Sequence, residues 1–196
     1  GTLDQAREAR VGRSENMSRS DTDLSFLYKL TPIARETALW ADGTMPLDVC
    51  AYISDRVPPA SLVSSVRCIL RRGADIMVIE DFKGDHHILP GGRCEPGEES
   101  EETLQRELLE ETGWTAHSPV LVGFTYFHHL QPAPEGYKYP HPDFFQLIYV
   151  SEAGEHRPDA MEEESEWEKA ADFRPATNVR SLNLDPINRA FLEANL

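Results

Sequence analysis

The pattern of hydrophobic and polar positions divides the chain into a polar start, a series of strand-like segments and two helices. Residues 1–23 mix acidic and basic side chains and contain no aromatic residue, so we expect a partly disordered arm there. Further along, short apolar runs bounded by glycine, proline or aspartate predict strands. The predicted strands lie at 49–53, 61–71, 76–80, 120–130 and 144–150.

Residues 24–40 regain apolar side chains, and their spacing predicts short helical or packing segments broken at a proline. The pair Pro58-Pro59 marks the end of this region. We therefore divide the chain into an N-terminal extension, 1–60, and a main domain, 61–196. The extension is expected to dock on the main domain or on a second subunit, and its exchange within a homodimer is one arrangement left open.

Local turn and capping signals predict two further features of the main domain. The stretch Arg72-Gly-Ala-Asp75 separates two apolar runs and predicts a hairpin turn. Asp185 followed by Pro186 is typical of a helix N-cap and first helical residue, so a last helix is predicted to end near Leu196.

A glycine-rich loop followed by an acidic helix occupies the middle of the chain. Residues 90–92 and 96–97 are proline and glycine, which favour a tight irregular loop, so the helix begins only afterwards. Ser100 is the predicted N-cap and Gly113 the predicted stop, which gives a helix over 100–112.

Three glutamates of this helix are predicted to share one face. At ~100° per residue, Glu111 lies about 40° to one side of Glu107, and Glu110 about 60° to the other. Two carboxylates about 4 Å apart repel by roughly 4 kcal/mol at an effective dielectric near 20, and Arg106 alone does not neutralise three of them. Such an oxygen-only cluster suits a hard divalent cation such as Mg²⁺. The simpler alternative is a solvated acidic face.

The spacing of the glycines, glutamates and arginine over residues 92–114 argues against a merely solvated face, because it fits a long and specific motif. The pattern is G-x5-E-x7-R-E-U-x-E-E-x-G-U, where U is a bulky apolar residue, and chance matches to it are rare. Its positions are occupied by Gly92, Glu98, Arg106, Glu107, Leu108, Glu110, Glu111, Gly113 and Trp114.

This motif resembles the signature of the Nudix hydrolase family, with Trp114 as a mild departure where a smaller aliphatic residue is commoner. The resemblance implies an α+β fold, an α/β/α sandwich with a mixed sheet, here with an N-terminal extension and a C-terminal helix. It also implies a hydrolase that uses Mg²⁺ or Mn²⁺. The reaction would cleave a diphosphate linkage in a nucleoside diphosphate joined to another group, as in a nucleotide sugar or an ADP-ribose-like compound.

Carried over position by position, the resemblance implies that Glu107, Glu110 and Glu111 bind metal and that Arg106 orients a glutamate, and these four residues form the predicted catalytic set. Glu98 would support the metal site, and the carbonyl of Gly91 would add a ligand. The general base stays open, because in this family it sometimes comes from a later loop. The candidates there are Glu152, Glu162, Glu163, Glu164 and Glu166, although 162–168 also fits a solvated acidic edge.

Substrate recognition is predicted in two loops. Residues 131–142 are too rich in proline for regular structure, and their aromatic residues and lysine could stack on a base and meet a phosphate. We assign Tyr137, Lys138 and Tyr139 to substrate binding, together with His87 from the loop before the motif. The alternatives are that the tyrosines pack the loop on its own domain and that the histidine is exposed and without a role.

Composition and charge limit the partners. A formal net charge of −15 argues against binding to nucleic acid, and no apolar run reaches the ~18 residues that a membrane-spanning helix needs. Three cysteines without C-x-x-C spacing predict a reduced, cytoplasmic protein. The expected partner is a small nucleotide. Two alternatives remain: a hydrolase of nucleoside triphosphates or dinucleotide polyphosphates, and a nucleotide-binding regulatory module without catalysis.

Overall fold

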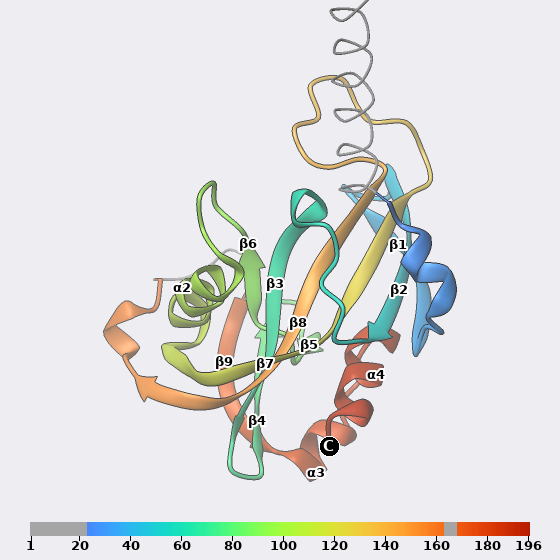
Figure 1. Ribbon diagram of the computed structural model, residues 1–196. Coiled ribbons are helices and arrows are strands. Elements are labelled where there is room, and N and C mark those ends of the chain that lie inside the picture. The colour runs from blue at the N-terminus through green and yellow to red at the C-terminus, as the bar shows by residue number, and fades with distance from the viewer. Residues whose placement is uncertain (1–22, 163–167) are drawn as a thin grey trace, which may run out of the picture.

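A computed structural model of the chain describes residues 23–162 and 168–196 (Figure 1). The elements are, in chain order, η1 (Ser25–Lys29), β1 (Ala34–Trp40), β2 (Met45–Ile53), η2 (Ala60–Leu62), β3 (Val63–Arg72), β4 (Asp75–Asp81), β5 (His86–His87), β6 (Gly91–Arg93), α2 (Ser100–Thr112), β7 (Trp114–His129), β8 (Asp143–His156), η3 (Pro158–Ala160), β9 (Glu168–Pro175), α3 (Ala176–Arg180) and α4 (Pro186–Ala194).

The strands of the described residues form one mixed sheet. Its main path runs β1-β2-β7-β8-β3-β4-β5, while β6 pairs with β3 and β9 pairs with β4. Strands β3 and β8 run parallel, and the other pairings are antiparallel. Strand β3 therefore lies inside the sheet, where it pairs with β6 of the glycine loop that precedes α2 and with β8, the strand that follows the loop 131–142.

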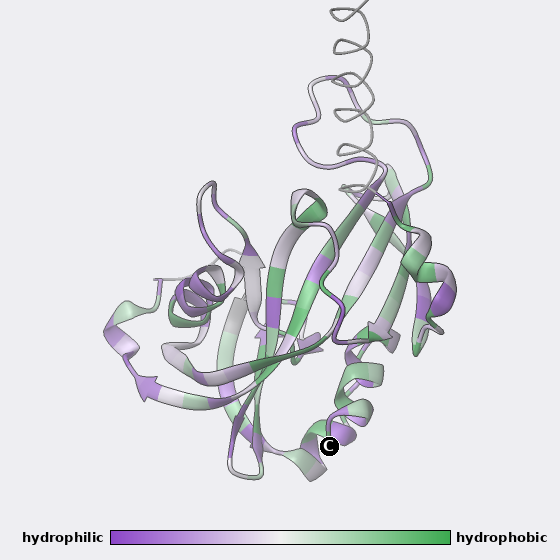
Figure 2. Cartoon of the chain, viewed as in Figure 1, coloured by the Kyte–Doolittle hydropathy of each residue, from purple (hydrophilic) through white to green (hydrophobic). Residues whose placement is uncertain are grey.

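The two longer helices cover opposite faces of this sheet. Leu104 and Leu108 of α2 are fully buried in one apolar cluster, and Phe191 and Leu192 of α4 are fully buried in the other. Burying a side chain of this size contributes about 1.5–3 kcal/mol relative to leaving it exposed, so each helix is anchored mainly by such residues. Figure 2 shows apolar colour along the central strands and polar colour over much of α2. The predicted α+β sandwich with a mixed sheet is confirmed.

The local signals of the main domain gave the correct elements. The helix over 100–112 has the predicted bounds, and Gly113 ends it in a left-handed conformation with φ of 75°. Strands β3 and β4 pair as a hairpin through Arg72 and Asp75. Helix α4 begins at Pro186 after its N-cap Asp185, whose carboxylate accepts a hydrogen bond from the Asn188 backbone N–H at 2.7 Å.

Two local predictions were wrong. Residues 34–40 form a strand and not a helical segment, because they pair antiparallel with β2 and alternate half-buried with exposed positions. Helix α2 has Glu99 and not Ser100 at its N-cap, and no side chain caps it. The loop before the helix is held instead by Glu98, whose carboxylate accepts hydrogen bonds from the Glu95 backbone N–H at 2.7 Å and the Thr103 hydroxyl at 3.0 Å.

Strands β7 and β8 extend well beyond the apolar runs that predicted them. They pair from Trp114 and His156 at one end to His128 and Asp143 at the other, with three register shifts on the way. One shift lies at Ser118-Pro119, where Ser118 has φ of 54°, because a proline is accommodated in a sheet at such irregularities.

Candidate functional site

The glycine loop is fixed to β3 by backbone pairing. Gly91 and Gly92 lie in β6 and pair with Arg67 and Val66 of β3. A Cβ atom at Gly91 would lie 2.1 Å from the Val66 carbonyl oxygen, and φ there is +151°, so only glycine lets β6 approach this closely.

Gly92 makes room for a carboxylate of α2. A Cβ atom at this position would lie 2.3 Å from Cδ of Glu107 and 2.4 Å from its Oε2. The missing side chain of Gly92 therefore defines the place where the Glu107 carboxylate rests against the backbone of β6.

Arg106 links the carboxylates around it. Its Nε and Nη2 donate to the two oxygens of Glu98 at 2.8 and 2.9 Å, its Nη1 donates to Glu107 at 2.8 Å and to Glu110 at 3.3 Å, and Nη2 also donates to the Arg93 carbonyl at 2.9 Å. The bonds from Arg106, followed by the one from the Glu95 backbone N–H, lower the pKa of Glu98 to about 2. The same Glu98 contacts raise the pKa of Arg106. The arginine thus holds three carboxylates and the glycine loop together, which is more than the single contact that we expected.

Glu110 and Glu111, in the last turn of α2, differ in their contacts. Glu111 accepts a hydrogen bond from the Gly91 backbone N–H at 2.9 Å, so it ties the last turn of α2 to the glycine loop. Glu110 is only weakly bound to Arg106, and burial followed by the charge of Glu107 raises the pKa of Glu110. The raised pKa of Glu110 thus reflects its burial first and the neighbouring negative charge second.

The oxygen atoms of the motif glutamates are the kind of ligand that a hard divalent cation prefers, and they lie on one helix face beside a glycine loop. Among residues 23–162 and 168–196, however, no group of three or more His, Cys, Asp or Glu side chains is arranged to hold a metal ion. Glu107 is bonded to Arg106, and Glu111 to the Gly91 N–H. Metal binding therefore requires these carboxylates to rotate, and the ligand roles of Glu107, Glu110, Glu111, Glu98 and the Gly91 carbonyl stay predictions.

Of the later glutamates, Glu162 lies beside α2. Its backbone N–H donates to the carbonyl of Glu110 at 3.0 Å, and its charge contributes to the raised pKa of Glu110. Glu152 lies on β8, opposite His117 of β7 and Arg71 of β3. The other candidates, Glu163, Glu164 and Glu166, lie outside the described residues.

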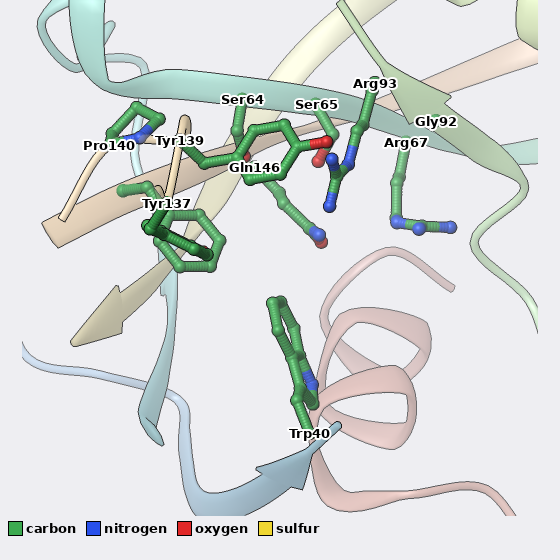
Figure 3. Close-up of a pocket in the computed structure, with 11 residues that line it drawn as sticks. Trp40, Ser64, Ser65, Arg67, Gly92, Arg93, Tyr137, Tyr139, Pro140 and Gln146 are labelled. Atoms are coloured by element: carbon green, nitrogen blue, oxygen red, sulfur yellow. The ribbon is translucent and has the colours of Figure 1, made fainter. Parts of the chain in front are cut away.

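A cavity of about 180 Å³ lies on the other side of Gly92 (Figure 3). Trp40 rises toward it from β1 and faces Gln146 and the loop tyrosines across an open space. Tyr137 and Tyr139 line this cavity, whereas Lys138 does not, and the Arg93 guanidinium lies 3.9 Å from the centre of the Tyr139 ring. Two of the three loop residues that we assigned to substrate binding thus line this cavity, and their binding role stays a prediction.

His87 lines an adjoining cavity of about 320 Å³, which shares Trp40, Arg67 and Gln146 with the first. Burial, followed by the nearby charge of Arg67, lowers the pKa of His87 to about 4. At neutral pH its imidazole is uncharged, so it offers a ligand a hydrogen bond and not a positive charge.

Among the described residues, no helix is both long and apolar enough to cross a membrane.

Several cavity residues were missed by the sequence analysis. Ser65 and Arg67 alternate along the strand predicted at 61–71, so their common face was readable from the sequence. No local pattern in the sequence indicates that Trp40, Arg93 and Gln146 line the cavity, because they come from three other strands.

The fold and the site define a class of protein: a mixed sheet between helical layers, with an acidic helix and a glycine loop beside an open cavity. Residues 62–194 match the model of the NUDIX domain family, which is more than half of the chain. The protein therefore belongs to the NUDIX domain family.

Individual relatives agree with this assignment. A putative 8-oxo-dGTP diphosphatase of Bacillus subtilis (strain 168) is 54% identical over 55 residues, which is 28% of this chain and 37% of that protein. The chain thus matches little more than a third of the length of that relative. The structure of a Bacillus subtilis pyrophosphohydrolase aligns with a TM-score of 0.50 at 19% identity, over 76% of this chain and 92% of that one. A MutT NUDIX hydrolase from Burkholderia pseudomallei aligns with a TM-score of 0.48 at 16% identity, over 67% of this chain and 96% of that one. At 19% identity, the likeness to the Bacillus subtilis structure shows a common fold.

Proposed function

We propose that this protein is a metal-dependent hydrolase that cleaves the diphosphate linkage of a nucleoside diphosphate joined to another group. The observation that carries the proposal is the position of Gly92. One side of this residue holds the Glu107 carboxylate, and the other side faces the cavity lined by Arg93 and the loop tyrosines. A nucleotide seated in the cavity would thus place its phosphates next to the acidic helix. Membership of the NUDIX domain family supports the reaction class.

Mg²⁺ or Mn²⁺ is the cofactor that we propose, with Glu107, Glu110 and Glu111 as ligands and with Glu98 and the Gly91 carbonyl in support. When bound, a divalent ion of this kind neutralises the charge of a diphosphate and lowers the pKa of a water molecule. The protein contributes the positioning of these groups. Glu98 accepts from Nε and Nη2 of Arg106, and these bonds hold the guanidinium beside Glu107 and Glu110 while the two carboxylates turn toward a metal ion.

The residues of the cavity supply the charge complement for the anionic substrate. Arg93 and Arg67 are the cations of its lining, and both lie within reach of the glycine loop, since Arg93 follows Gly92 and Arg67 pairs with Gly91. For the general base we favour Glu162, because of the two later glutamates that the structure describes it is the one that lies beside Glu110.

A nucleoside triphosphate is the second candidate substrate. The name of the Bacillus subtilis relative, a putative 8-oxo-dGTP diphosphatase, favours it. Both substrates carry the same phosphoanhydride bond, and they differ only in the group on the far side of it.

The test is turnover of a substrate panel by the full chain with Mg²⁺ or Mn²⁺, using nucleotide sugars, ADP-ribose, dinucleotide polyphosphates and nucleoside triphosphates. For nucleotide sugars, ADP-ribose and dinucleotides, which have no terminal phosphate, phosphate released after treatment with a phosphatase reports cleavage. For triphosphates, phosphate released by inorganic pyrophosphatase reports it instead. We expect Glu107→Gln and Glu111→Gln each to lower kcat by at least about 100-fold while the circular dichroism spectrum is retained.

Glu102→Gln is the matched control, because Glu102 lies on the same helix but is exposed. It should retain wild-type kcat. Full activity of both Glu107→Gln and Glu111→Gln would contradict the proposed site. Tight nucleotide binding with no turnover of any substrate in the panel would favour a regulatory module instead.

A further inference from the structure

The cavity beside Gly92 contains a buried polar atom that the protein leaves unsatisfied. The Oγ atom of Ser65 is the one buried side-chain nitrogen or oxygen without a hydrogen-bond partner among residues 23–162 and 168–196, and Ser65 is only 3% exposed. Buried hydroxyl groups are normally paired, because leaving one unpaired costs its full desolvation. Figure 3 shows this side chain projecting from β3 toward the same space as Gln146.

Ser65 and Gln146 are partners in the sheet. They are paired in the register of β3 and β8, so their side chains leave the same face next to one another. Thr125 of β7 is paired with Gln146 in turn, so a row of three polar residues crosses this face of the sheet. The Gln146 amide makes no hydrogen bond to another described residue, so both of its polar atoms are available to a ligand. A planar amide beside a hydroxyl can recognise the edge of a heterocyclic ring.

Aromatic side chains provide surfaces on which such a ring would stack. Trp40 faces the amide of Gln146 from below, and Tyr137 and Tyr139 lie on the opposite side of the cavity. Base–aromatic stacking of this kind contributes to binding whichever base is present, so it supplies affinity and little selectivity. Selectivity must therefore come from the polar atoms.

Those polar atoms are mainly hydrogen-bond donors. The described residues that line the cavity include two arginines, Arg67 and Arg93, and no carboxylate, although the chain as a whole has a net charge of −15. One Nη of Arg67 donates to the Leu89 carbonyl at 2.9 Å, and its remaining N–H groups make no hydrogen bond to another described residue. A donor-rich lining is complementary to a ring edge that carries carbonyl oxygens and not amino groups.

We propose that Ser65, Gln146 and Arg67 form a nucleobase subsite that reads the base edge bearing O6 and N7 of guanine or hypoxanthine, or O4 of uracil. It would select these bases over adenine and cytosine, which carry an amino group at the corresponding position. This inference rests on the proposed function, because it names the base of the substrate for the same site. An amino base would place its own N–H donors against the arginine and leave donors on both sides unpaired, which disfavours its binding.

The experiment measures binding without turnover, so that its outcome does not depend on catalysis. Isothermal titration calorimetry of the full chain in metal-free buffer would compare GMP and UMP with AMP and CMP. We expect GMP to bind at least about tenfold more tightly than AMP, and Gln146→Leu to remove this preference. Equal affinities for GMP and AMP in the wild-type protein would overturn the proposal.

Ser65→Ala and Ser151→Ala form a matched pair, because both serines are 3% exposed. The Ser151 hydroxyl is partnered, with the His117 carbonyl at 3.0 Å and the Glu152 carbonyl at 2.9 Å, whereas that of Ser65 is not. We expect Ser65→Ala to weaken GMP binding about three- to tenfold with an unchanged or higher Tm. Ser151→Ala should lower the Tm by about 2–4 °C and leave GMP binding unchanged.

The outcomes separate this inference from the proposed function. A GMP preference without hydrolysis of any substrate would uphold the subsite and reject the hydrolase. Hydrolysis with equal kcat/KM for guanine and adenine substrates would reject the subsite alone. A fall in Tm for Ser65→Ala as large as that for Ser151→Ala, without any loss of GMP binding, would show that the hydroxyl serves the fold and would also reject it.

Discussion

Gly92→Ala is expected to disable the site while leaving the fold intact. The new Cβ would lie 2.3 Å from Cδ of Glu107, whereas ordinary contacts begin at 3.4 Å. The carboxylate must therefore move by about 1 Å, which a flexible side chain does easily. The backbone of Gly92 itself tolerates alanine, because its φ lies outside the left-handed region.

The effect on stability should be small and the effect on catalysis large. Moving Glu107 weakens its 2.8 Å hydrogen bond from Arg106. Both side chains are partly exposed, so this loss should cost about 1 kcal/mol and lower the Tm by about 2–4 °C. A catalytic group misplaced by 1 Å costs on the order of 100-fold in rate. We therefore expect kcat to fall by about 100-fold on the best substrate of the panel.

Two further glycines serve as controls for this reasoning. Gly91→Ala places a Cβ 2.1 Å from the Val66 carbonyl oxygen, a backbone atom that cannot move aside, so this variant should lose the cooperative unfolding transition. At Gly84 nothing lies within 4 Å and φ is +85°, so Gly84→Ala should cost about 1 kcal/mol of stability and leave kcat unchanged. Thermal unfolding followed by circular dichroism and kcat for the same samples separate the three cases. Wild-type kcat in Gly92→Ala would refute the proposed role of Glu107.

Two other predictions concern stability. Burial, followed by the charge of Arg67, lowers the pKa of His87 from 6.5 to about 4, so below pH 6.5 the unfolded chain binds a proton that the folded protein does not. The free energy of unfolding should therefore fall by up to about 3 kcal/mol through His87 as the pH drops from 6.5 to 4. In urea unfolding, His87→Gln should lack this part of the pH dependence. Asn188→Ala should lower the free energy of unfolding by about 2 kcal/mol, because the side-chain Oδ1 of Asn188 accepts from the buried Ile88 backbone N–H at 2.9 Å. Asn183→Ala is the exposed control, and equal urea midpoints for the two alanine variants would contradict this reasoning.

The sequence by itself determined the elements whose signals are local. Prolines and glycines at 90–97 and the stop at Gly113 were sufficient to delimit α2, and the spacing within 92–114 was sufficient to indicate the family. The hairpin at Arg72 and the capped start of α4 were equally readable. In each case the residues that determine the element lie within a few positions of it.

Only the tertiary structure decided which distant residues meet. The pairing of Ser65 with Gln146 depends on the register of two parallel strands that are far apart in sequence, and no local pattern encodes that register. Residues 34–40 form a strand because they pair with the edge of β2, and this pairing places Trp40 at the cavity. Helical periodicity placed the glutamates on one face, but the packing of β6 against β3 decided that Glu107 would rest on Gly92 beside an open cavity. Contacts of this kind arise from long-range packing, which a single sequence does not reveal.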